Sequence, residues 1–226
     1  MQILTISTIF AGNNLFRLLN GLVVTIEISL ISIILGTILG VILGSLWSAA
    51  GTLIKPIFKA YLEIFRVVPT IPLLFLFYYI FPRNLNINLS AMQVSILVFS
   101  LWFAAELSDI VRGAIQSISK SQRENAYSIG LTTLQTYRYV LIPQSVPNIL
   151  PAFINLSSRI IKTTSILLLI SVTDVITVGQ QIIEANAQDT AVPLLIYGFI
   201  ALLYFLINYL LSHFSRRLER KYRKYE

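Results

Sequence analysis

Four residues that could bind a charged small molecule interrupt apolar stretches of the chain, namely Glu106, Asn155, Arg159 and Lys162. The last three are separated by four and three residues, so a helix would carry them on one face. An ionisable side chain inside a membrane is costly and usually faces a protein interior or a wet cavity. In such a cavity Lys162 or Arg159 could hold a carboxylate, and Glu106 could hold an ammonium group.

Each of these charged residues also has a purely structural interpretation. Glu106 is expected a short distance inside the end of its helix, where it could pair with Arg112 or with another helix. Arg159 and Lys162 could extend their charged ends to the inner membrane surface. The residues alone leave both interpretations open.

The composition is that of a membrane protein. Hydrophobic residues make up 56% of the 226-residue chain and charged residues only 12%, against about a quarter in soluble domains. There is no cysteine and a single histidine, which excludes thiol chemistry and a histidine-based metal site. None of the ten glycines precedes a lysine, so the P-loop that binds ATP is missing. We therefore expect no catalytic, metal-binding or cofactor-binding residue in this chain.

Apolar runs predict one all-α transmembrane domain over residues 1–226, with about five membrane-spanning helices. A short interfacial segment is expected over 1–20 and a polar connection over 48–60. The spans are expected at roughly 21–47, 61–81, 91–115, 152–183 and 192–212. Within the first span, glycines recur every four residues at 36, 40 and 44, which indicates a face for close packing against another helix.

Two of the predicted spans contain residues that favour a break. Pro69 and Pro72 remove two backbone donors from the second span, so a kink is expected there. The polar run Ser171–Asp174 should break or bend the fourth span. In the third span, Asp109 and Arg112 are three residues apart and can pair on one helix face.

The longest polar segment, 119–143, lies between two spans and reads as two short helices with a glycine hinge. Ser121 and Glu124 fit a capping box at the start of the first helix. Gly130 lies where a helix end favours a residue that tolerates positive φ. The pair Thr132–Gln135 repeats the capping pattern, and Pro143 is expected to stop the second helix.

The distribution of cations predicts the orientation. With five spans, 15 of the 17 cations fall on one side or at the helix ends facing it. These are Lys55, Lys59, Arg66, Arg112, Lys120, Arg123, Arg138, Arg159, Lys162 and the six cations of the tail 213–226. Only Arg17 and Arg83 fall on the other side. The positive-inside rule then puts the N-terminus outside and the C-terminus in the cytoplasm, with the basic tail near anionic lipid. This explains the net charge of +7 without nucleic acid.

The polar segment resembles the cytoplasmic EAA loop of ABC-importer permeases, E-A-A-x3-G-x9-I-x-L-P, which appears here as E-N-A-x3-G-x9-V-x-I-P. The matching residues are Glu124, Ala126, Gly130 and Pro143. The departures are Asn125, Val140 and Ile142. The resemblance implies that this loop couples the chain to a separate ATPase.

Other segments resemble the polar amino acid branch of the same family. The stretch from Glu63 to Tyr79 resembles E-x-F-R-G-T-P-x-L-V-Q-L-F-x-x-Y-Y, with Val67, Val68 and Leu73 in place of its Gly-Thr pair and Gln. The matching residues are Glu63, Phe65, Arg66, Pro69, Leu74, Phe75, Tyr78 and Tyr79. The stretch ELSDIVRGAIQSI resembles Y-x-A-E-I-V-R-G-G-I-Q-S-I, with Glu106 in the tyrosine position. The residues Asn155 and Lys162 match N-x6-K-[DE]-[ST], whose acidic position is Thr163 here and which lacks an equivalent of Arg159.

The resemblance implies the MetI-like bundle of type I ABC importers and a path for a polar amino acid or a close derivative. It implies two ATPase subunits that bind ATP and Mg²⁺, a second permease subunit and an external substrate-binding protein. The expected location is the bacterial plasma membrane, which the chain crosses several times. Two alternatives stay open on the sequence, namely an ion-coupled secondary carrier and a membrane scaffold without transport activity.

Overall fold

The computed structural model describes residues 11–222, and throughout this range the secondary structure is helical, with short connections. Two five-residue segments, η1 and η2, are π-helical and η3 is a 3₁₀ helix. The elements are α2 (Asn14–Ala49), α3 (Lys55–Val67), α4 (Thr70–Phe75), η1 (Leu76–Ile80), α5 (Phe81–Leu85), α6 (Ala91–Ser117), α7 (Lys120–Ser128), α8 (Thr133–Thr136), η2 (Tyr137–Leu141), α9 (Ile142–Thr163), η3 (Thr164–Ile170), α10 (Val175–Ala185) and α11 (Val192–Tyr222).

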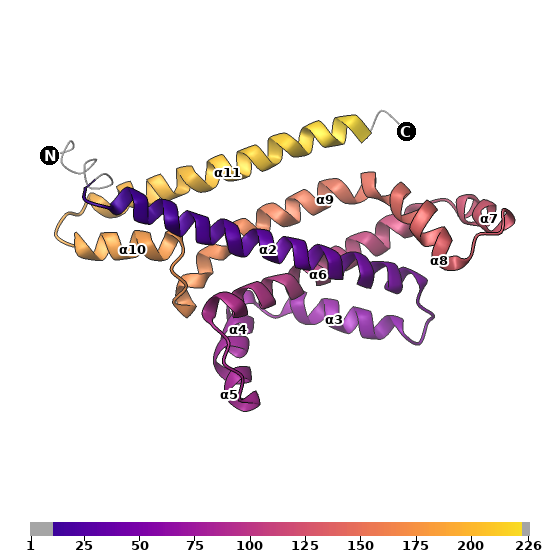
Figure 1. The fold of residues 1–226 in the computed structure, drawn as a ribbon, viewed down its shortest axis with the longest axis horizontal. Helices are drawn as coiled ribbons and strands as arrows, with labels where there is room; N and C mark the ends of the chain where they lie inside the picture. Colours follow the sequence, from indigo (N-terminus) through magenta and orange to yellow (C-terminus); the bar gives the residue numbers. More distant parts are fainter. Residues whose placement is uncertain (1–10, 223–226) are drawn as a thin grey trace.

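The long helices lie roughly along one axis, and α4 and α5 turn away from it (Figure 1). Figure 1 also shows the α2–α3 connection, the α7–α8 loop and the end of α11 gathered toward one end of the molecule. The start of α2 and the α10–α11 connection lie at the opposite end (Figure 1). The cation count put the α2–α3 connection, the α7–α8 loop and the C-terminal tail on one side of the membrane. In the fold, the described parts of these three segments lie toward the same end of the molecule.

Helices α2 and α6 are packed closely through the three glycines of α2. A Cβ added to Gly36 or Gly40 would lie 2.8 Å from a side-chain atom of α6, and one added to Gly44 would lie 2.5 Å from the carbonyl oxygen of Ser108. Small residues at such a contact let two helix backbones approach. The predicted packing role of the glycines is confirmed.

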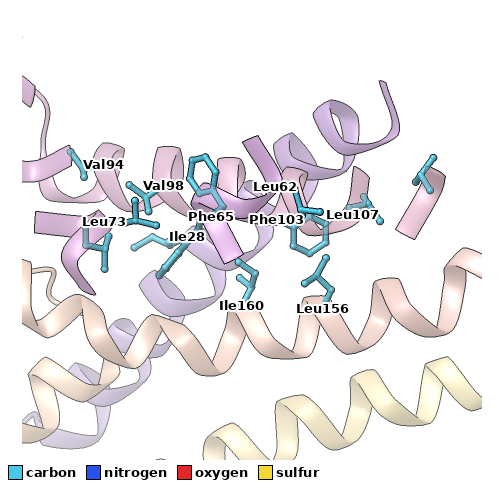
Figure 2. Close-up of a cluster of buried hydrophobic side chains, with 14 of the residues drawn as sticks. Ile28, Leu62, Phe65, Leu73, Val94, Val98, Phe103, Leu107, Leu156 and Ile160 are labelled. Carbon is cyan, nitrogen blue, oxygen red and sulfur yellow. The ribbon is translucent and has the colours of Figure 1, made fainter. Parts of the chain in front are cut away.

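The main apolar core forms where α3 and α9 pack on this helix pair. Figure 2 shows Phe103 and Leu107 of α6 facing Leu156 and Ile160 of α9, and all four side chains are buried. Leu62 and Phe65 of α3 belong to the same core. A second, smaller core joins the first part of α2 to α10 and α11. These contacts hold the helices that carry the charged residues.

The second predicted span is broken rather than kinked. Helices Lys55–Val67 and Thr70–Leu85 meet at an angle of 104°, with Val68 extended and Pro69 at the start of the second helix. Proline has no N–H to continue the first helix and disfavours helical geometry in the residue before it. Four helices in the described range are long and apolar enough to cross a membrane, or five if this bent pair is one span. The chain is a multi-pass membrane protein.

The first and second elements have different limits from those expected. Helix α2 begins at Asn14, so residues 14–20 are part of the first span and not an interfacial segment, while residues 1–10 lie outside the described range. The predicted polar connection 48–60 is reduced to 50–54, because α2 continues to Ala49 and α3 begins at Lys55. Its polar residues were compatible with helix, and the apolar face of α3 packs on the core.

The fourth span also begins earlier, at Thr133, and ends at Ile170. The expectation that Pro143 stops a helix is wrong, since Pro143 lies in the first turn of α9 and the helix continues through Pro147 and Pro151. The wide π-helical turn of η2 directly precedes α9. Such a turn changes the backbone pairing locally, which can accommodate a proline that lacks a donor.

The predicted break over Ser171–Asp174 is confirmed. Ser171 has a φ of 61° and ends η3, and Asp174 caps α10 by accepting a hydrogen bond from the Thr177 amide at 2.9 Å. The segment after the break is therefore a separate helix of 11 residues and not the end of the fourth span.

Candidate functional site

The first candidate site is the loop α7–α8, which projects at the end of the molecule where α11 also ends (Figure 1). The N-cap of α7 is Ser119, so the predicted capping box at Ser121 and Glu124 is wrong. The helix starts two residues earlier than the pattern suggested, which puts Ser121 inside it. Glu124 is exposed and instead pairs with Lys120 at 3.1 Å, one helical turn away.

The hinge of this loop has the predicted geometry. Gly130 has a φ of 85°, and a Cβ added there would meet no atom within 4 Å. Glycine is therefore required at position 130 by the positive φ and not by close packing within the chain. Thr132 accepts a hydrogen bond from the Gln135 amide while the Gln135 side chain accepts one from the Thr132 amide, which confirms the second capping box.

The loop exposes large apolar side chains that no motif singled out. Ile129 is 77% exposed and Leu134 78% exposed, and Tyr127 and Tyr139 are also exposed. Ala126 is buried against the chain and Pro143 is exposed. Isoleucine and leucine on a polar connecting loop leave apolar area uncovered, which indicates a contact surface for another protein. The sequence signal for this surface was an apolar residue, Ile129, directly before the Gly130 hinge of an otherwise polar loop.

The second candidate site is a cluster of four charged residues between α3 and α6. Arg66 lies 3.5 Å from Glu106 and 3.3 Å from Asp109, measured between guanidinium nitrogen and carboxylate oxygen. Asp109 also accepts a hydrogen bond from Arg112 at 2.6 Å, so the predicted Asp109–Arg112 pair is confirmed. Glu106 pairs with the other helix, through Arg66, rather than with Arg112.

The cluster lies deeper along the helices than expected. Glu106 is near the middle of α6, which spans Ala91–Ser117, and not close to its end. Arg66 is at the far end of α3 from Lys55, next to the α3–α4 break. The Arg66 side chain is 43% exposed and the Glu106 side chain 17% exposed. The apolar helix α6 therefore carries partly exposed ion pairs near its middle. Charged residues at such a position in a membrane helix are candidates for a functional role.

The residues predicted on one face of α9 are exposed but point to different neighbours. The Arg159 guanidinium lies 5.5 Å from the ring centre of Trp102 on α6. Lys162 lines an open hollow of about 260 Å³ between α9, α10 and α11. The other lining residues are Ser165, Ile176, Tyr197, Ile200, Ala201 and Tyr204. Asn155 is exposed on the same helix. Within the described residues, Glu106 has an ion pair with Arg66 and none with Arg159 or Lys162.

The depth of these two cations was also predicted incorrectly. Lys162 and Arg159 are much closer to Ile170, the far end of the fourth span, than to Thr133. The error follows from the span limits, since the span begins well before residue 152. Arg159 and Lys162 therefore lie far from the start of the fourth span, and Arg66 lies at the end of α3 away from the α2–α3 connection. Lys55 and Lys59 of α3 and Lys120 and Arg123 of α7 still belong to elements that reach the end carrying the α7–α8 loop.

A broken-helix membrane bundle with a projecting helical loop is compatible with the membrane component of a transporter. The sequence profile described as "Binding-protein-dependent transport system inner membrane component" matches residues 36–224, and the chain belongs to this family.

Several relatives align with nearly the whole chain. The probable glutamine ABC transporter permease protein GlnP of Bacillus subtilis (strain 168) is 30% identical over 210 residues, which is 93% of this chain and 95% of the relative. The probable amino-acid ABC transporter permease protein YckA of the same organism is 32% identical over 207 residues, 92% of this chain and 89% of the relative. Its L-cystine transport system permease protein TcyB is 31% identical over 205 residues, 91% of this chain and 86% of the relative.

Solved structures share the fold. A chain of an amino acid ABC transporter crystallised with histidines has a TM-score of 0.78 at 26% identity, covering 91% of this chain and 94% of that one. A chain from an inward-facing MetNI methionine ABC transporter has a TM-score of 0.76 at 19% identity, covering 92% of this chain and 99% of that one. The predicted all-α ABC-importer permease fold is confirmed.

Proposed function

We propose that this chain lines half of the translocation path of an ATP-driven importer for a polar amino acid or a close derivative, and that it hydrolyses no ATP itself. The observation that carries the proposal is the exposed apolar surface of the α7–α8 loop on a member of this family. Relatives named for glutamine and L-cystine support the substrate class. The missing P-loop assigns ATP and Mg²⁺ to a separate subunit.

The loop is the proposed contact with the ATPase. Ile129 and Leu134 would enter an apolar groove, while Gly130 sets the angle between the two short helices. Of the other motif residues, Glu124 is stabilised by Lys120, and Ala126 lets α7 lie close to the rest of the chain. Pro143 begins the helix that receives the movement. The full assembly would contain two permease subunits, two ATPase subunits and an external binding protein.

The substrate path is proposed to use the charges that the membrane would otherwise penalise. A zwitterion needs a cation for its carboxylate and an acceptor for its ammonium group. Lys162 has no ion-pair partner among the described residues and borders a hollow, so it suits the carboxylate. Glu106 suits the ammonium group, which would have to compete with Arg66 for it. Asn155 and Arg159 are further candidates along the α9 face.

The proposed orientation puts the N-terminus outside and the C-terminus in the cytoplasm of a bacterium. The basic end of the molecule then carries the α7–α8 loop and faces the ATPase and anionic lipid. No role for nucleic acid is proposed, since the positive charge is explained by membrane orientation.

The docking surface is tested by Ile129→Asp. A buried carboxylate without a partner is strongly unfavourable in an apolar groove, so we expect the co-purifying ATPase to be lost while the permease stays inserted. Ser128→Asp is the matched control, since it adds the same charge one residue away on an exposed polar position. Co-purification of the ATPase with both variants at the wild-type ratio would contradict the docking assignment.

A further inference from the structure

A series of side-chain contacts, linked at one point by the chain neighbours Trp47 and Ser48, runs from the α7–α8 loop into the membrane bundle through Tyr137. Tyr137 is the first residue of the π-helical turn η2 and is buried. On its loop side, the guanidinium of Arg123 on α7 lies 6.0 Å from the tyrosine ring centre. On its other side, its hydroxyl oxygen lies 3.1 Å from that of Ser48, in the last turn of α2. Tyr137 therefore touches both the loop and the first span.

The contacts continue from the end of α2 to the break in the second span. Trp47, the neighbour of Ser48, stacks on Phe58 of α3 at 5.9 Å between ring centres. The Arg112 guanidinium lies 4.7 Å from the Trp47 ring centre. Arg112 in turn donates to Asp109, which also pairs with Arg66 beside the α3–α4 break. Together with the backbone link between Ser48 and Trp47, these contacts join five helical elements, namely α7, η2, α2, α6 and α3.

The elements in this series differ in how easily they can move. Helices α2 and α6 are locked together, because a Cβ at any of the three glycines between them would clash. Arg66, in contrast, is partly exposed and lies where two helices meet at 104°. Rigid bodies joined by a break are the usual parts of hinge motions. Movement of the α2–α6 pair would therefore change the distances from Arg66 to Glu106 and Asp109.

We propose that Tyr137 transmits movement of the α7–α8 loop to the end of α2, and that the ion pairs of Arg66 carry it to the α3–α4 break beside Glu106. This relay rests on the proposed function, since it requires that the loop receives movement from an ATPase. It assigns a positioning role to Tyr137, which occupies one of the unspecified positions between Gly130 and Val140 of the loop motif. The test measures the coupling between ATP hydrolysis and uptake directly.

The test uses the permease purified with its ATPase and binding protein and reconstituted in liposomes, with amino acid uptake per ATP hydrolysed as the readout. Tyr137→Phe keeps the buried ring and its contact with Arg123 but removes the hydroxyl that meets Ser48. We expect this ratio to fall by about two- to tenfold, the range for one neutral hydrogen bond. Tyr209→Phe is the control, because Tyr209 lies on α11, outside the contact series and the α7–α8 loop, with an exposed ring and no hydroxyl contact in the described range.

A double variant separates transmission from local stability. Ser48→Ala should lower the ratio as Tyr137→Phe does, and the two together should cause no further loss, because both remove the same bond. A normal ratio in Tyr137→Phe, or additive losses in the double variant, would overturn the relay. Loss of the ATPase from Tyr137→Phe would also overturn it, by making Tyr137 a docking residue. Absence of ATP-dependent uptake in the wild-type complex would instead refute the proposed function.

Discussion

Arg66 stands between two carboxylates, and this arrangement limits what Glu106 can do. The arginine lies within 3.5 Å of Glu106 and within 3.3 Å of Asp109, so it can release one partner while keeping the other. Arg112 also neutralises Asp109, which leaves Glu106 as the carboxylate with the longer and weaker contact. A substrate ammonium group could therefore displace Arg66 from Glu106 without leaving the arginine uncompensated.

The charged residues of the path are tested by Glu106→Gln and Lys162→Ala. Each change removes a charge that the proposed substrate would meet, and a hydrogen bond to a charged group corresponds to roughly tenfold or more in binding. We expect uptake at low substrate concentration to fall at least about tenfold in each variant, measured at matched surface expression.

The matched control for these variants is Glu27→Gln, which removes an exposed charge from α2. It should leave uptake at the wild-type level. Wild-type uptake in both Glu106→Gln and Lys162→Ala would remove the two residues from the substrate path.

Sequence reasoning found these charged residues but not their partners. The cost of charge in lipid identifies Glu106 and Lys162 from residue type alone. Their partners depend on which helices become neighbours, and that was set by the position of the α3–α4 break and by the true start of the fourth span. Arg66 was noted as part of a motif, although its pairing with Glu106 was visible only in the folded chain.

At the scale of elements, the α2–α6 pair gives the bundle its rigid part. Its glycine ridge was predicted correctly because a four-residue spacing identifies a helix face without knowledge of the partner. The limits of α9 were predicted incorrectly because Pro143 was treated as a helix stop. The rule that proline ends a helix is weaker in membrane proteins, because neighbouring groups and π-helical turns can satisfy the backbone carbonyl that loses its donor.

The glycine ridge predicts opposite effects for the same substitution at two glycines. Gly44→Ala would put a Cβ 2.5 Å from the Ser108 carbonyl oxygen, so we expect it to destabilise the protein by about 1–3 kcal/mol. Gly113→Ala on α6 meets no atom within 4 Å and should stabilise its helix by about 0.5–1 kcal/mol. Thermal unfolding of the purified protein in detergent would show the two shifts, and equal shifts in both variants would refute the ridge.

At the scale of the whole molecule, the two ends of the bundle carry different chemistry. One end gathers the α2–α3 connection, the α7–α8 loop and the end of α11, as Figure 1 shows. The charge count anticipated this grouping even though three of its cations, Arg66, Arg159 and Lys162, lie farther along their helices from that end. The excess of cations on one side was large enough that the predicted orientation did not depend on these three residues. The contact series through Tyr137 depends on packing among distant segments and carried no signal of its own in the sequence.

The central claim is that transport by this protein is driven by ATP bound to another subunit. The most direct measurement is uptake of labelled glutamine and other polar amino acids into liposomes that contain the permease, its co-purified ATPase and the binding protein, with and without ATP inside the cytoplasmic-facing compartment. We predict uptake of at least one of these substrates only with ATP and in proportion to its hydrolysis. Uptake that an ion gradient drives in the absence of ATP would contradict the claim and identify the chain as a secondary carrier.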